Sequence, residues 1–237
     1  LVNANLPSDF GSVTPGSPPS GGYPTPIANS TFTLETCYCN NVIVAIDNNS
    51  QFILGETSPN NKAVVIFHEG SNLFLRNNSQ LILNENSQLI IEKGAKFQIE
   101  SGAKIILKNG AKIIVQPGAQ FILQPNTEIQ LQGPNSLFDV QETNVFITLS
   151  NNTEQILFTN ATGNSQGGTA QFAGGDFSQA SGSKLIIENC TVKFLYDKNA
   201  QMIYHYFAGA DLQLQGDKAI LDLQGDLYLG SGSKFTF

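Results

Sequence analysis

The sequence predicts an all-β fold, a single-chain β-solenoid (parallel β-helix) preceded by an extended, proline-rich N-terminal arm. Three observations predict it: residues 70–133 are eight consecutive octads, each octad has large apolar side chains at its fourth and sixth positions, and each begins with Gly or Asn. Because side chains alternate between the faces of a strand, positions two, four and six point inward and positions three, five and seven point outward. A continuous helical stripe needs apolar residues three and four apart, so this spacing favours strands.

The repeat length constrains the winding of the chain. The octads read GSNLFLRN, NSQLILNE, NSQLIIEK, GAKFQIES, GAKIILKN, GAKIIVQP, GAQFILQP and NTEIQLQG. Two octads would make a flattened coil of 16 residues and three a triangular coil of 24. With 24, Leu73, Phe97 and Phe121 form one column, whereas with 16 the two Phe side chains separate, so we favour 24. The Gly or Asn that starts each octad suits a corner with positive φ.

Four regions follow one another along the chain. Residues 1–31 hold six of the ten prolines without periodicity, so they are expected to be an extended arm, or alternatively a disordered linker. Residues 32–237 are expected to form the solenoid, with irregular strands over 32–69 and regular octads over 70–133. From 134 to 208 the strands are irregular, and the Gly-rich stretch 163–183 is expected to be a protruding loop. The octad returns in the C-terminal coils, 209–237.

Composition narrows the function. Charged residues make up only 13% of the chain and the net charge is −7, so no basic patch favours nucleic acid. No apolar run approaches the length of a membrane-spanning helix, about 20 residues, so no membrane span is expected. With one Arg, no Trp and only His68 and His205, the sequence offers neither convergent catalytic groups nor metal-ligand spacing. We therefore expect no enzyme activity and no cofactor.

Cysteines and asparagines supply two further expectations. Cys37 and Cys39 lie two apart on one strand face, so a disulfide between Cys190 and one of them is the expected bridge. The remaining thiol would be buried or would link to another chain. Asn-x-Ser/Thr sequons, which are candidate glycosylation sites, occur at Asn29, Asn48, Asn77, Asn151, Asn160 and Asn189. The alternative for these asparagines is a corner or an asparagine ladder.

The end of the chain suggests assembly. Leu227, Leu229, Phe235 and Phe237 continue the apolar spacing to the last residue, and no capping helix is predicted at either end. An uncapped coil is a template for another subunit, and such a heterologous contact propagates as a filament. On the arm side, Ile27, Phe32 and Leu34 are candidates to dock on a neighbouring subunit as an added strand.

The fifth position of the octads supports association. It should face solvent, yet it is apolar in six of the eight octads: Phe74, Ile82, Ile90, Ile106, Ile114 and Ile122. Exposed apolar rows mark interaction surfaces, although the β-propensity of Ile is an equally good explanation.

The octads, above all GAKIILKN and GAKIIVQP, resemble repeats in bacterial extracellular β-solenoid surface proteins and adhesins. The resemblance implies secretion to the cell exterior or surface and a structural or adhesive role, and it carries over no functional residue. The chain begins at Leu1 without a signal-peptide pattern, so we expect a processed form or a fragment. We predict a self-assembling subunit of an extracellular filament. The alternative is an adhesive or carbohydrate-binding surface domain, with a surface polysaccharide as partner and residues 134–208 as its ligand face.

Overall fold

The computed structural model describes most of the chain after the arm. The described residues are 31–34, 36–39, 41–46, 50–55, 62–76, 78–141, 144–149, 154–161, 165–173, 176–179, 182–195, 205–207, 210–224 and 227–237. The predicted arm therefore lies almost entirely outside them, as do Ile27, Asn29, Asn48, Asn77 and Asn151.

The described chain is all-β and winds through three parallel sheets. The first sheet contains β1 (Thr31–Leu34), β4 (Gln51–Leu54), β7 (Gln80–Leu83), β10 (Lys104–Leu107), β13 (Thr127–Leu131), β16 (Gln155–Thr159), β19 (Lys184–Glu188), β22 (Asp211–Gln215) and β25 (Lys234–Thr236). The second contains β2 (Thr36–Cys39), β5 (Val64–Phe67), β8 (Gln88–Ile91), β11 (Lys112–Val115), β14 (Leu137–Val140), β17 (Thr169–Ala173), β20 (Thr191–Leu195) and β23 (Ile220–Leu223). The third contains β3 (Ile43–Ile46), β6 (Asn72–Leu75), β9 (Lys96–Ile99), β12 (Gln120–Leu123), β15 (Asn144–Leu149), β18 (Asp176–Gln179), β21 (His205–Phe207) and β24 (Leu227–Leu229).

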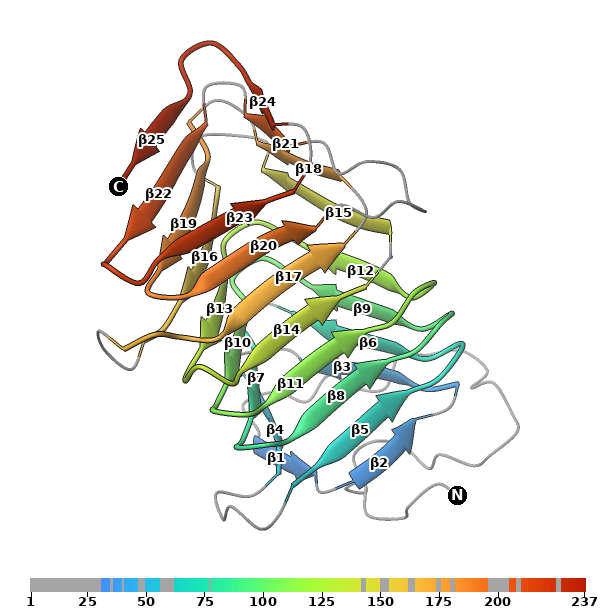
Figure 1. The fold of residues 1–237 in the computed structure, drawn as a ribbon. Coiled ribbons are helices and arrows are strands. Elements are labelled where there is room, and N and C mark those ends of the chain that lie inside the picture. The colour runs from blue at the N-terminus through green and yellow to red at the C-terminus, as the bar shows by residue number, and fades with distance from the viewer. Residues whose placement is uncertain are drawn as a thin grey trace.

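Successive strands enter successive sheets, so three strands complete one coil and every third strand is a hydrogen-bonded neighbour. Figure 1 shows the coils stacked along one axis, with the blue N-terminal strands at one end and the red C-terminal strands at the other. The predicted β-solenoid is confirmed. The coil length is confirmed as well, because Leu73 pairs with Phe97 and Phe97 with Phe121, each step being three octads along the sequence. Among the described residues no helix is long and apolar enough to cross a membrane.

The corners form as their sequence predicts. The first residue of every octad, whether Gly or Asn, has a φ between 59° and 82°. At Gly102 a Cβ would also meet the Asn78 carboxamide oxygen of the preceding coil, so the Asn78 side chain would have to shift to admit one. Glycine therefore suits this corner both for its φ and for the close approach of the Asn78 side chain.

Inward positions build one continuous core. Side chains at octad positions four and six are fully buried, and the small residues at position two, such as Ala103 and Ser87, lie beside them. Phe97 and Phe121 stack with their ring centroids 5.8 Å apart, a separation typical of aromatic pairs. The core runs through the whole described solenoid because each coil covers the one before it.

The expectation of a protruding loop over 163–183 is wrong. Two strands of the solenoid, β17 and β18, lie within this stretch, and Phe172 of β17 is buried in the core. Gly167 and Gly168 precede β17 because the chain there passes directly against neighbouring coils, where a Cβ on Gly168 would collide with the Ser136 backbone. The coils of this region differ in length, because successive paired strands of the second sheet are separated by unequal stretches of sequence.

Candidate functional site

The last coil exposes the end of the apolar core on the first sheet. One column of inward residues runs from Leu185 through Leu212 to Phe235, and the exposed fraction of the side chains rises from 0% through 3% to 37%. The neighbouring column ends at Phe237, which is 88% exposed. The Phe235 and Phe237 rings stack on each other 6.4 Å apart, so they present one apolar surface.

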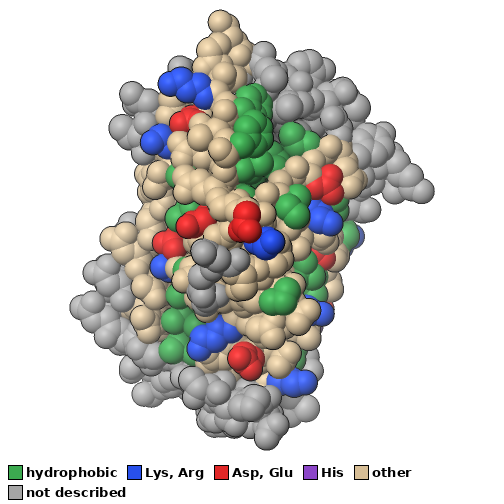
Figure 2. All heavy atoms as spheres, turned by 60° about the vertical axis from the view of Figure 1, so that its left-hand side comes forward, with side chains coloured by type: hydrophobic (Ala, Val, Ile, Leu, Met, Phe, Trp, Pro, Cys, Tyr) green, Lys and Arg blue, Asp and Glu red, His purple; other side chains and the backbone are tan. Residues whose placement is uncertain are grey.

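The second sheet ends in the same way. Leu221 and Leu223 of β23 continue the core columns of Val192 and Phe194 but are only partly buried, and Ile220 is 48% exposed. On the third sheet the register places Leu227 and Leu229 of β24 beside His205 and Phe207 of β21. Figure 2 shows hydrophobic side chains gathered near the C-terminal end of the molecule.

Open strand edges lie at the same end of the solenoid as this apolar surface. β25, β23 and β24 are the last strands of the three sheets, and within the described residues no further strand pairs with their outer edges. An open strand edge offers unpaired N–H and C=O groups that bind another strand readily. Of the predicted assembly residues, Leu227 and Leu229 lie in β24, Phe235 lies in β25 and Phe237 follows β25, so all four lie in or beside the last described strand of a sheet.

The other end of the solenoid differs from this one. β1, β2 and β3 are the first described strands of their sheets, and the register aligns Phe32 and Leu34 with the buried Phe52 and Leu54. The described inward side chains of this first coil, among them Val44 and Ile46, are buried within the subunit. Among the side chains that the structure describes, the exposed large apolar ones therefore lie toward the C-terminal end.

The outward apolar rows lie along the sides of the rod. All six residues predicted for them, Phe74, Ile82, Ile90, Ile106, Ile114 and Ile122, point outward and are half-buried. In-register neighbours form two aliphatic ladders, Ile53–Ile82–Ile106 on the first sheet and Ile66–Ile90–Ile114 on the second. The ring of Phe74 on the third sheet lies under Arg76 and Lys96, whose charged groups are each 5.4 Å from its centroid. Neighbouring long side chains therefore cover part of Phe74.

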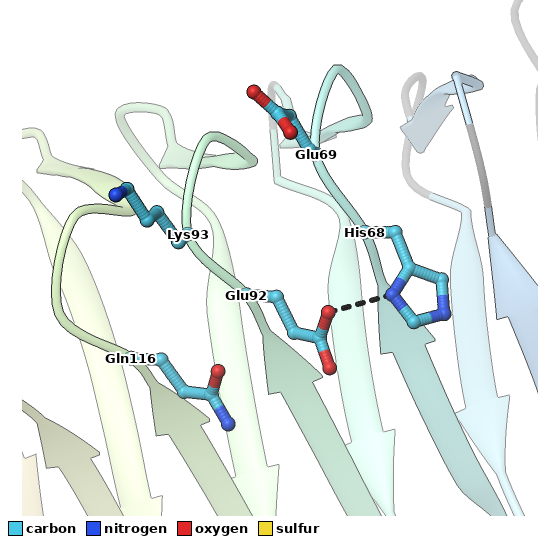
Figure 3. A pocket seen from close by; sticks show the side chains of 5 residues that line it. All are labelled: His68, Glu69, Glu92, Lys93 and Gln116. Atoms are coloured by element: carbon cyan, nitrogen blue, oxygen red, sulfur yellow. Dashed lines mark hydrogen bonds and ion pairs between the residues drawn. The ribbon is translucent and has the colours of Figure 1, made fainter.

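A shallow hollow lies at the corner that follows β5, β8 and β11, and Figure 3 shows the five side chains that line it. His68 Nδ1 is 2.6 Å from Glu92 Oε2, and Glu69, Lys93 and Gln116 complete the lining. No partner for His68 was predicted from the sequence. The separation between His68 and Glu92 is three octads, one full coil, and this spacing is the signal that would have paired them. The hollow therefore combines a hydrogen-bonded imidazole and carboxylate with one further acidic, one basic and one amide side chain. It is open to solvent.

The predicted disulfide is wrong. Cys190 is a buried free thiol at the corner before β20, and burial raises the pKa of this thiol to about 12. Cys37 and Cys39 lie in β2, six strand spacings away along the second sheet. At about 4.8 Å for each spacing, the separation is roughly 29 Å. A disulfide requires Cα atoms within about 7 Å, so Cys190 is out of reach of both.

Two sequon asparagines are described, and both are corner residues. Asn160 is buried and its side-chain amide donates a hydrogen bond of 2.7 Å to the Ser165 carbonyl oxygen. Asn189 is buried with a φ of 51°, and its side chain lies against Gly216 of the next coil. The sequence left two roles open for these asparagines, a glycosylation site or a corner residue. For Asn160 and Asn189 the structure favours the corner residue.

Comparison with known proteins finds no family model, no curated protein and no solved structure that matches this chain. The class of protein, a β-solenoid, therefore follows from the fold alone. The apolar last coil, with its open strand edges, is suited to association with another β-coil.

Proposed function

We propose that this chain is a structural subunit of an extracellular filament, in which subunits stack head to tail through the last coil. The observation that carries the proposal is the exposure of Phe235 and Phe237 at the end of columns that are otherwise buried. Burying both rings under another coil would remove apolar area from water and so stabilise the contact.

The type of contact follows from the parallel sheets. The edges of β23, β24 and β25 present hydrogen-bonding groups with the spacing of a parallel neighbour, and β1, β2 and β3 of a second copy have the same direction and the same triangular cross-section. Each copy would leave its own last coil open in turn. A heterologous contact of this kind does not close, so it produces a filament.

Residues 1–31 are proposed to dock on the adjacent subunit as an extended segment. Their length and proline content suit an extended arm, and such segments bind to strand edges or to apolar rows. The half-buried Ile ladders on the sides of the rod are the surface that we propose for this arm. The proposed extracellular location rests on the resemblance of the octads to repeats of bacterial surface proteins.

Negative-stain electron microscopy of the purified protein at several concentrations tests the proposal, with a variant that lacks residues 1–31 imaged alongside. We expect long, uniform filaments from the full chain and shorter or fewer filaments from the truncated variant. Single short rods at every concentration would contradict filament assembly. That result would favour the adhesive or carbohydrate-binding alternative, which glycan-array binding of the full chain would then examine.

A further inference from the structure

An apolar column and a polar column run side by side along the outer face of the second sheet. The apolar column is the ladder Ile66–Ile90–Ile114. The polar column lies two residues further along the chain in each coil and consists of His68, Glu92 and Gln116. Figure 3 shows these polar side chains at the ends of successive strands. The two columns are about 6.8 Å apart, and each repeats once per coil, about every 4.8 Å.

The hollow beside the polar column lies at a corner that is built from glycine in three successive coils. These glycines are Gly70, Gly94 and Gly118, whereas each of the other two corners of the octads includes Asn. The Glu69 side chain lies against Gly94 and the Lys93 side chain against Gly118, so a Cβ on either glycine would displace them. Glycine at this corner therefore lets one acidic and one basic side chain line the hollow.

From these columns we infer that the outer face of the second sheet binds an extended, neutral polysaccharide that lies along the solenoid axis. Each sugar residue would place an apolar C–H face on the Ile column, where its burial stabilises the contact. Its hydroxyl groups would reach the polar column. Amide and carboxylate side chains suit hydroxyl groups, because a hydroxyl both donates and accepts hydrogen bonds. The site would be present on single subunits as well as on filaments.

The polar side chains of the hollow favour a ligand without charge. Glu69 and Glu92 are acidic, Lys93 is basic, and His68 Nδ1 lies 2.6 Å from Glu92 Oε2. An anionic chain would meet two carboxylates and a cationic chain would meet Lys93, whereas hydroxyl groups need no opposite charge. Among the described residues the side chains of Glu69, Lys93 and Gln116 have no hydrogen-bond or ion-pair partner, so they are available to a ligand.

The spacing of the columns favours a polymer of β-linked sugars. An extended glycan of this kind advances by a distance close to one strand spacing per residue. Successive sugars would therefore meet an equivalent Ile and an equivalent polar side chain in each coil. The polar column spans three coils, so about three sugar residues would be held. The first-sheet ladder Ile53–Ile82–Ile106 remains for the proposed arm.

The dependence of binding on glycan length tests the inference. Isothermal titration calorimetry of the full chain would compare glucose, cellobiose, cellotetraose and cellohexaose, which are neutral and, as oligomers, extended. We expect the affinity to increase up to the length that spans the polar column and to change little beyond it. Maltohexaose has the same composition but a curved chain, so it should bind more weakly than cellohexaose.

Substitutions in one coil locate the site. Gln116→Ala and Ile114→Ser each remove one side chain, from the polar and the apolar column respectively. Loss of one hydrogen bond should weaken cellohexaose binding by about 2- to 12-fold in Gln116→Ala. Ile114→Ser should weaken it by a similar factor. Gln120→Ala and Ile122→Ser are the matched controls, because they remove the same kinds of side chain from the third sheet, and they should leave binding unchanged.

Melting temperatures of all four variants check that each subunit is folded. Absence of binding to every oligosaccharide would overturn the inference, as would equal affinity for glucose and cellohexaose or for maltohexaose and cellohexaose. An equal effect of the third-sheet controls would also overturn it. Filament formation is scored separately by electron microscopy, so a failure of the proposed assembly is distinguished from a failure of glycan binding.

Discussion

Replacing Phe237 by Ser tests whether the last coil is an assembly surface. Phe237 is 88% exposed, so it contributes little to the stability of the subunit. Under another coil its ring would become buried, and full burial of a Phe side chain stabilises by about 1.5–3 kcal/mol. Phe237→Ser should therefore weaken each end-to-end contact by roughly 10- to 150-fold. The melting temperature of the subunit should stay the same, because exposed substitutions change stability by only about 0.5 kcal/mol.

The critical concentration for assembly measures this loss, by sedimentation of filaments across a dilution series. Thermal unfolding under non-assembling conditions reports subunit stability in parallel. Ile122→Ser is the matched control, because it removes a half-buried apolar side chain from the third sheet, away from the ends of the rod and outside the two Ile ladders. An unchanged critical concentration for folded Phe237→Ser would refute the reasoning. So would an equal effect of Ile122→Ser.

Three further predictions concern the corners of the solenoid. Gly102→Ala should lower the free energy of unfolding by about 1–3 kcal/mol in urea titrations, and Gly102→Asn by less, because asparagine adopts the same φ at Asn126. Cys190 should resist thiol reagents at pH 8 until the protein unfolds. Because burial raises its pKa from 9.0 to about 12, stability should fall as pH rises above 9, where only the unfolded thiol ionises. Asn189 is buried, so peptide mass spectrometry after secretion from a glycosylating host should find it unmodified.

The regular part of the fold could be predicted from sequence because its determinants are local. Strand alternation assigns inward and outward positions, and Gly or Asn marks each corner. The stack of Phe97 on Phe121 then selected three octads per coil over two. None of these steps needs a contact beyond the neighbouring coil, so a few consecutive repeats carry the information.

The irregular region could not be predicted in this way, because its determinants are contacts between coils of different length. Over 163–183 the polar and Gly-rich composition is typical of a loop, and the strand alternation of β17 rests on two inward residues, Ala170 and Phe172. Gly167 and Gly168 look like loop residues in the sequence, yet they are required by the close approach of neighbouring coils. Composition alone does not predict this packing between coils.

The candidate interface was only partly visible in the sequence. The apolar spacing predicted that Phe235 and Phe237 point inward. Their exposure depends on whether other residues cover the last coil, and only the folded structure shows this.

The disulfide prediction was wrong because of the solenoid architecture. A solenoid converts separation along the sequence into distance along an axis, so residues one coil apart touch, as His68 and Glu92 do, and residues many coils apart never meet. Cys190 and Cys39 are separated by six strand spacings, and no loop movement shortens a continuous stack of sheets. For the same reason an inward side chain in the middle of the rod always has a neighbour above and below it. In the last coil the inward column ends at Phe237, which is 88% exposed, and this exposure supports the proposed assembly surface.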